Sequence, residues 1–118
     1  PSSVYAMTKL ANMLFTVELA RRLEDSGVTA NCLHPGVIDT KLYRGYMGMP
    51  GSNSADEDQL EDGAATSVYL AASEEGGEVS GKYFSRRRQA AASAQSRDME
   101  LAQRLWLASE RLTGLDAG

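Results

Sequence analysis

The sequence is poor in the residues that build disulfides and metal centres. Its 118 residues include one cysteine, Cys32, and one histidine, His34. A lone cysteine excludes an internal disulfide, which fits a reducing, intracellular compartment, either the cytoplasm or an organelle. One cysteine and one histidine do not supply the ligand cluster of a zinc site. We therefore expect no metal centre, and we interpret both residues as structural parts of a strand.

Long apolar runs and an excess of positive charge are also missing. No run approaches the ~18 apolar residues of a membrane helix, and the first residues lack a targeting pattern. The formal net charge of -4 argues against a nucleic-acid surface. The one cationic cluster, Arg86-Arg87-Arg88, is typical of a solvated strand end and is assigned no function. We expect neither a transmembrane segment nor a nucleic-acid partner.

What remains is enough for one modest hydrophobic core. The chain has 118 residues, of which 42% are hydrophobic, and this is too short for two ordinary domains. No internal repeat and no break in composition marks a second domain. A single domain is expected.

A strongly helical segment covers residues 4–23. Its apolar positions lie on more than one side of a helix, which predicts burial on several sides. Gly27 supplies the stop. Charged residues one turn apart predict two ion pairs near its end, Glu18 with Arg22 and Arg21 with Asp25.

Residues 28–34 follow at once and read as a buried strand, bounded by Gly27 and by Pro35-Gly36. Helix, tight turn and strand together suggest half of a β-α-β unit in a mostly parallel sheet, hence an α/β fold. Ligands of open α/β sheets bind beyond the carboxyl ends of the strands. The expected ligand rim is therefore Pro35, Gly36, Val37, Ile38, Asp39 and Thr40. A plain turn explains Pro35-Gly36 equally well, so both interpretations stay open.

The rest of the chain predicts a loop, two more helices and one more strand. The expected order is a polar loop over 43–59, a helix over 61–73 that ends at 74–77, a weaker strand over 79–85, a connector over 89–95, and a third helix from a cap at Ser96 to a stop at Gly114. One apolar stripe marks the third helix, with Ala102 and Trp106 beside it: Leu101, Leu105, Ala108 and Leu112.

Tyr5 and Lys9 stand four residues apart near the start of the first helix, which places the phenol and the ammonium on one face. A tyrosine titrates near ~10 in water, so it exchanges protons at neutral pH only where a neighbouring cation favours its phenolate. Lys9 is placed to be that cation. On these residues alone, an amphipathic tyrosine beside a solvated lysine is the preferred interpretation.

A longer string of residues makes the pattern specific. Its parts are Tyr5-x-x-x-Lys9, Thr8-Lys-Leu-Ala-Asn12, Leu14-Phe-Thr16, Glu18-Leu-Ala-Arg-Arg-Leu23, Gly27-Val-Thr-Ala-Asn31, Leu33-His-Pro-Gly-Val37, Gly63-Ala-Ala-Thr66, Val79-Ser-Gly-Lys-Tyr-Phe84 and Ser109-Glu-Arg-Leu-Thr-Gly114. With them the chain resembles the carboxyl-terminal half of a short-chain dehydrogenase/reductase, and more narrowly the retinol-dehydrogenase-like branch of that family. Apart from the loop at 45–60, the resemblance covers nearly the whole chain.

The resemblance implies an NAD(P)-dependent oxidoreductase that interconverts an alcohol and a carbonyl on a small apolar molecule. Tyr5 would be the catalytic acid/base, and Lys9 would favour its phenolate and hold the nicotinamide ribose hydroxyls. Four residues would line the nicotinamide ring: Pro35, Gly36, Val37 and Ile38. Thr40 would cover the diphosphate or carboxamide side. The cofactor would be NADP or NAD, with NADP slightly preferred. The helix 4–23 would offer a homodimer contact.

The implied fold is the carboxyl-terminal half of a Rossmann-like, doubly wound parallel sheet, with residues 1–118 forming part of a single domain. The family's glycine-rich cofactor loop and its catalytic serine and asparagine lie upstream of Tyr5, outside these residues. The isolated chain is therefore expected to be inactive, marginally stable and prone to aggregate through uncovered strand edges and helix faces. The alternative is a truncated, non-catalytic chain or interaction module that lacks cofactor binding.

Overall fold

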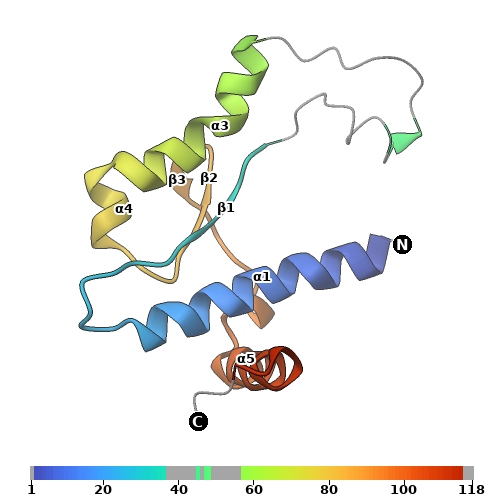
Figure 1. Cartoon of the computed structure of the whole chain (residues 1–118). Coiled ribbons are helices and arrows are strands. Elements are labelled where there is room, and N and C mark those ends of the chain that lie inside the picture. The colour runs from blue at the N-terminus through green and yellow to red at the C-terminus, as the bar shows by residue number, and fades with distance from the viewer. Residues whose placement is uncertain (1, 37–44, 46, 49–56, 116–118) are drawn as a thin grey trace.

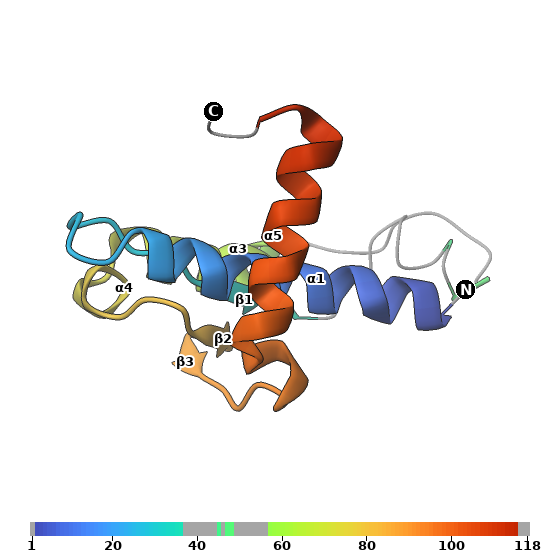
Figure 2. The ribbon, with the colours of Figure 1, turned by 90° about the horizontal axis from the view of Figure 1, so that it is seen from below.

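The computed structural model describes residues 2–36, 45, 47, 48 and 57–115, with no account of the side chains of residues 2 and 57–60. Its elements are α1 (Ser2–Arg22), β1 (Cys32–His34), α3 (Glu57–Ala72), α4 (Glu74–Glu78), β2 (Tyr83–Ser85), β3 (Arg88–Gln89), a short 3-10 helix η1 (Gln95–Arg97) and α5 (Met99–Thr113). The architecture is mixed α/β: a small sheet lies between α3 and α4 on one side and α1 on the other (Figure 1). The α5 helix packs across the face of α1 that points away from the sheet (Figure 2).

The sheet contains the expected parallel pair. β1 runs parallel to β2, with Leu33 opposite Phe84, and the Phe84 side chain is fully buried. β3 adds to the other edge of β2 in the antiparallel sense, with Ser85 opposite Arg88. The sequence did not predict β3; the connector predicted over 89–95 is confirmed over 90–94, whereas Gln89 belongs to β3 and Gln95 begins η1. A two-residue turn at 86–87 brings the chain back onto β2 at once.

Both strands are shorter than predicted, because side chains replace part of the backbone ladder. The backbone N–H of Ala30 donates to the Ser80 hydroxyl at 3.0 Å. The Asn31 amide donates to the Val79 carbonyl at 2.8 Å and accepts from the Lys82 N–H at 3.1 Å. Serine and asparagine compete in this way with regular pairing. The segments 28–31 and 79–82 therefore lie side by side without forming a regular ladder.

Two predicted helix starts are wrong: α3 begins at Glu57, inside the predicted loop, rather than at residue 61, and α5 does not begin at a Ser96 cap; α3 ends at Ala72, next to its predicted end. The predicted stop at 74–77 is a short helix, α4, whose cap is Ser73: its hydroxyl accepts a hydrogen bond from the Gly76 N–H. Ser96, predicted as the cap of the last helix, is buried inside η1. The actual cap of α5 is Asp98, which accepts from the Leu101 N–H at 3.0 Å. Gly114 ends α5 with φ 68°, as predicted.

The carboxyl-terminal half of α1 is buried on more than one side, as predicted, between the sheet and α5, whereas its amino-terminal half is exposed among the described residues. Leu14 and Ala20 lie in the core, but Val4 and Met7 are 62% and 68% exposed. The amino-terminal half of α1 extends past the edge of the small sheet, so the described residues place no layer against it (Figure 1). Apolar composition gives the number of apolar faces on a helix, and only the neighbouring elements decide which of them are covered.

The side of α5 that packs against α1 is not the apolar stripe predicted from the sequence. Trp106 stacks on Phe15 of α1 with ring centroids 5.3 Å apart, and Ala102 is fully buried. Ala108 is exposed, and Leu112, from the predicted stripe, is 87% exposed. Trp106 lies beside the stripe, and its large ring packs on Phe15, whereas Leu112 of the stripe stays exposed.

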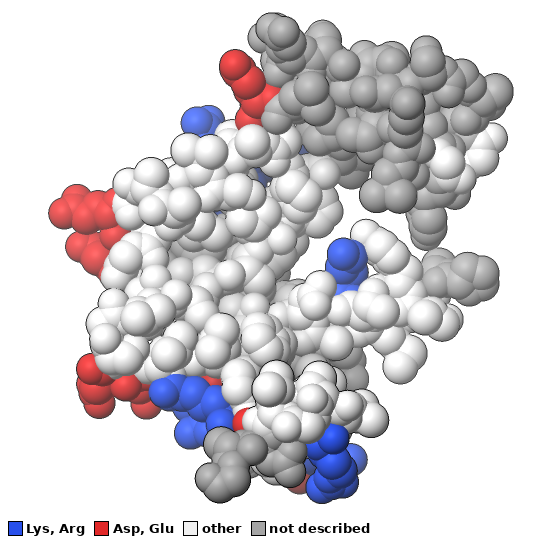
Figure 3. Space-filling view, in the orientation of Figure 1, with Lys and Arg blue, Asp and Glu red and all other residues white. Residues whose placement is uncertain are grey.

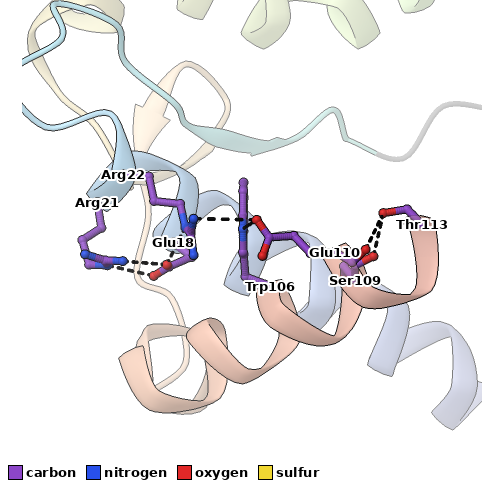
Figure 4. Close-up of polar contacts among 7 residues, drawn as sticks. All are labelled: Glu18, Arg21, Arg22, Trp106, Ser109, Glu110 and Thr113. Carbon is purple, nitrogen blue, oxygen red and sulfur yellow. Dashed lines mark hydrogen bonds and ion pairs between the residues drawn. The ribbon is translucent and has the colours of Figure 1, made fainter. Parts of the chain in front are cut away.

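A buried carboxylate joins the two helices through arginine. Glu18 is fully buried and accepts hydrogen bonds from Arg21 at 2.8 and 2.9 Å and from Arg22 at 2.8 Å (Figure 4). The Arg22 guanidinium lies 4.5 Å from the Trp106 ring centroid and 3.8 Å from the Glu110 carboxylate. The pair of Glu18 with Arg22 is confirmed. Arg21 pairs with Glu18 rather than with the predicted Asp25, which has turned into a left-handed conformation at φ 63°.

Candidate functional site

Tyr5 and Lys9 lie on one exposed face of α1, as their spacing predicted. The Lys9 Nζ is 5.1 Å from the centroid of the Tyr5 ring, within range of a cation–π attraction. The Thr8 hydroxyl donates to the Tyr5 carbonyl at 2.7 Å, one helical turn back. Tyr5 is 54% exposed, so its ring is open to a molecule arriving from solvent. The pair is therefore accessible and held on a regular helix.

Pro35 and Gly36 follow the carboxyl end of β1. Gly36 has φ 95°, a conformation that favours glycine, and its N–H donates to His34 Nδ1 at 2.9 Å. A Cβ at Gly36 would meet nothing within 4 Å, so the backbone here is open on its outer side. The other predicted rim residues, Val37, Ile38 and Thr40, lie outside the described residues. Pro35 and Gly36 also line a pocket, which is compatible with both interpretations, a plain turn and a ligand rim.

That pocket has a volume of about 420 Å³. The residues that line it come from three segments: Pro35, Gly36, Asp62, Ala65, Thr66, Arg86 and Arg87. Thr66 is buried on α3, and its hydroxyl accepts a hydrogen bond from the Arg87 N–H at 3.1 Å. Sequence reasoning missed this contribution of Arg86 and Arg87. The pairing of β1 with β2 was the needed signal, because parallel strands end at the same edge of a sheet.

The structure brings the two predicted parts of the site to one end of the molecule. The amino-terminal end of α1, which carries Tyr5 and Lys9, and the carboxyl end of β1 point the same way (Figure 1). A helix followed by a strand that folds back on it gives this arrangement. The described residues thus hold a phenol, an ammonium group and an open strand end on one side.

Two titratable groups away from the candidate site have pKa values that are shifted by their surroundings. Burial raises the pKa of the Cys32 thiol, which keeps the thiol protonated, and its Sγ lies 3.6 Å from the Lys82 carbonyl. A hydrogen bond to Glu75 raises the pKa of Tyr69, whose ring packs near Phe84. Among the described residues, no group of three or more His, Cys, Asp or Glu side chains is arranged to hold a metal ion.

In the view of Figure 3, the basic and acidic side chains of the described residues are interspersed along the surface. No helix in the part of the chain that the structure describes has the length and apolar character needed to cross a bilayer.

Comparison with known proteins finds that the chain is similar to several dehydrogenases. No family model matches the chain. Retinol dehydrogenase 13 of Homo sapiens is 45% identical over 125 residues, which is 98% of this chain and 38% of the relative. Retinol dehydrogenase 14 of Homo sapiens is 41% identical over 121 residues, 97% of this chain and 36% of the relative. Polyprenol dehydrogenase of Mus musculus is 38% identical over 130 residues, 100% of this chain and 37% of the relative. The chain spans well under half the length of these relatives.

Proposed function

Because the chain is a homologue of the retinol dehydrogenases, in the short-chain dehydrogenase/reductase family, we propose that it forms part of an oxidoreductase that interconverts an alcohol and a carbonyl. The identity of 45% over 98% of the chain with retinol dehydrogenase 13 carries this proposal. The placement of Tyr5 and Lys9 on one exposed face of α1 supports it. The substrate would be a small apolar molecule, since the named relatives act on retinol and on a polyprenol.

In the proposed mechanism Tyr5 is the acid/base. Its phenol would donate a proton to the carbonyl oxygen during reduction, and its phenolate would remove the proton from the alcohol during oxidation. Lys9, 5.1 Å from the ring centroid, would stabilise the phenolate through its positive charge. The helix fixes their separation, because both side chains leave the same face one turn apart.

The described residues fit one side of a nicotinamide cofactor, whose chemistry when bound is to give or accept a hydride. Lys9 would supply an ammonium group for the ribose hydroxyls, and Pro35 and Gly36 would line the ring, where a Cβ at Gly36 would meet nothing within 4 Å. Val37, Ile38 and Thr40 complete the proposed cofactor-binding set. We assign NADP or NAD, with NADP preferred. The fold proposed for the whole protein is a doubly wound parallel sheet of which β1 and β2 form one edge.

The test uses residues 1–118 joined to the amino-terminal part of a retinol dehydrogenase relative, so that a cofactor-binding half is present. The joined protein is expected to oxidise or reduce NADP(H) with an apolar alcohol or aldehyde, followed by absorbance at the nicotinamide band. Tyr5→Phe is expected to abolish turnover and leave cofactor binding unchanged. Tyr83→Phe is the matched control, since it removes the same hydroxyl from β2, outside the residues proposed for the site. Retained turnover in Tyr5→Phe would refute the assignment.

A second candidate is a non-catalytic chain that pairs with another copy of itself. The exposed apolar side chains at the start of α1, Val4 and Met7, favour it, because such a face is typical of a subunit contact. The homodimer through helix 4–23 belongs to this candidate and is compatible with the first. Calorimetry of the isolated chain with NADPH, together with a sizing column, separates the two: a dimer without cofactor binding favours the second candidate.

A further inference from the structure

The pocket beyond β1 and β2 contains two arginines that the proposed function does not use. His34 pairs with Ser85, so the residues that follow each strand meet at one edge of the sheet. Pro35 and Gly36 come from β1, and Arg86 and Arg87 come from the turn after β2. All four line the pocket of about 420 Å³.

The backbone of this turn is unusual for arginine. Arg86 has φ 51° and Arg87 has φ 60°, between the paired residues Ser85 and Arg88. Two-residue hairpin turns with positive φ at both central positions favour Asn-Gly, because side chains with a Cβ are strained there. Strained residues concentrate at sites where the side chain has a role. Two cationic side chains are therefore held at the pocket at a conformational cost.

The charges of this turn are available to a ligand. In the part of the chain that the structure describes, neither Arg86 nor Arg87 forms an ion pair, and both are exposed. The N–H of Arg87 donates to the buried Thr66 hydroxyl, which anchors the turn on α3. Asp62 is the acidic member of the lining, so two guanidinium groups share the pocket with one carboxylate.

We propose that this pocket binds an oxyanion, the phosphate or carboxylate group of a small molecule, through Arg86 and Arg87. A guanidinium presents paired donors that match the oxygens of either group, and charge-assisted hydrogen bonds are the strong kind. The position next to Pro35 and Gly36 places the anionic end of the ligand on the same edge of the sheet as the proposed reaction. The proposal goes beyond an apolar alcohol or carbonyl substrate, because it adds a recognised charge.

The test measures binding of inorganic phosphate and of acetate to the whole chain at low ionic strength, by calorimetry and by amide shifts of Gly36, Thr66 and Arg87. The variant is Arg86→Asn/Arg87→Gly, which keeps the turn because asparagine and glycine suit positive φ. The control is Arg88→Ala/Arg97→Ala, which removes the same charge from residues outside the pocket. Circular dichroism verifies that both variants stay folded.

The native chain is expected to bind the anion saturably. The affinity should fall about tenfold or more in the turn variant and about twofold or less in the control. Asp62→Asn is expected to tighten binding, because it removes the repelling carboxylate. Tighter binding of phosphate than of acetate assigns a phosphate group, and the reverse assigns a carboxylate. No saturable binding, or equal losses in the turn variant and the control, would overturn the proposal. Neither outcome bears on Tyr5, since no cofactor or turnover enters the measurement.

Discussion

Replacing Glu18 by glutamine tests how α1 is held to the rest of the molecule. Hydrogen bonds from Arg21, opposed by burial and assisted by Arg22, lower the pKa of the Glu18 carboxyl from 4.5 to about 2. The carboxylate is therefore more stable in the folded chain than in the unfolded chain. Glu18→Gln removes the charge, keeps the size of the side chain, and leaves Arg22 without the anion that positions it over Trp106.

The size of the effect follows from the pKa. A difference between 4.5 and about 2 corresponds to about 3 kcal/mol of unfolding free energy. The side chains of Arg21 and Arg22 are 45% and 34% exposed, so solvent screens the interaction. We expect a net loss of about 1–2 kcal/mol in Glu18→Gln at pH 7.

The sign of the pH dependence is fixed by the direction of the pKa. Because the folded-state pKa is lower than the unfolded one, the stabilisation is complete above pH 4.5 and is lost as the pH falls toward about 2. The gap in unfolding free energy between the native chain and Glu18→Gln should therefore close over this range.

The assay is urea unfolding followed by far-UV circular dichroism at pH 7, 4.5, 3 and 2. Glu78→Gln is the matched control, since Glu78 is exposed at the end of α4 and forms no ion pair with another described residue. The control should differ from the native chain by less than about 0.5 kcal/mol at each pH. A gap for Glu18→Gln that is the same at pH 7 and pH 2 would refute the reasoning.

Two further substitutions test local packing and capping by the same urea assay. Gly76→Ala would place a Cβ against the carbonyl of Leu70 and should lower the free energy of unfolding by about 1–3 kcal/mol. Gly77→Ala is the control: its Cβ would meet nothing within 4 Å, so the loss should be less than about 1 kcal/mol. Equal losses in the two variants would contradict the packing at Gly76. Asp98→Ala removes the acceptor for the Leu101 N–H and should cost about 1 kcal/mol, and Asp98→Asn should recover most of it if capping is the cause.

The sequence by itself determined those features that depend only on residues close to one another in the chain. The apolar run and the glycine that follows it predicted α1 and its end, and the glycine at φ 68° predicted the end of α5. The four-residue spacing of Tyr5 and Lys9 predicted their shared face, since the helical period alone decides it. The pair of Glu18 with Arg22 followed from the same period.

Only the tertiary structure decided which of these surfaces meet. The sequence offered apolar residues on several sides of α1 and one apolar stripe on α5, but the stacking of Phe15 on Trp106 places the contact beside that stripe and leaves Leu112 exposed. The sequence also contains three consecutive arginines, and nothing in it assigns the first two and the third to different surroundings. The parallel register of β1 with β2, set by contacts about fifty residues apart in the chain, brings Arg86 and Arg87 to Gly36 and leaves Arg88 in β3. Periodicity reports which residues share an element, whereas pairing between distant segments depends on the packing of the whole molecule.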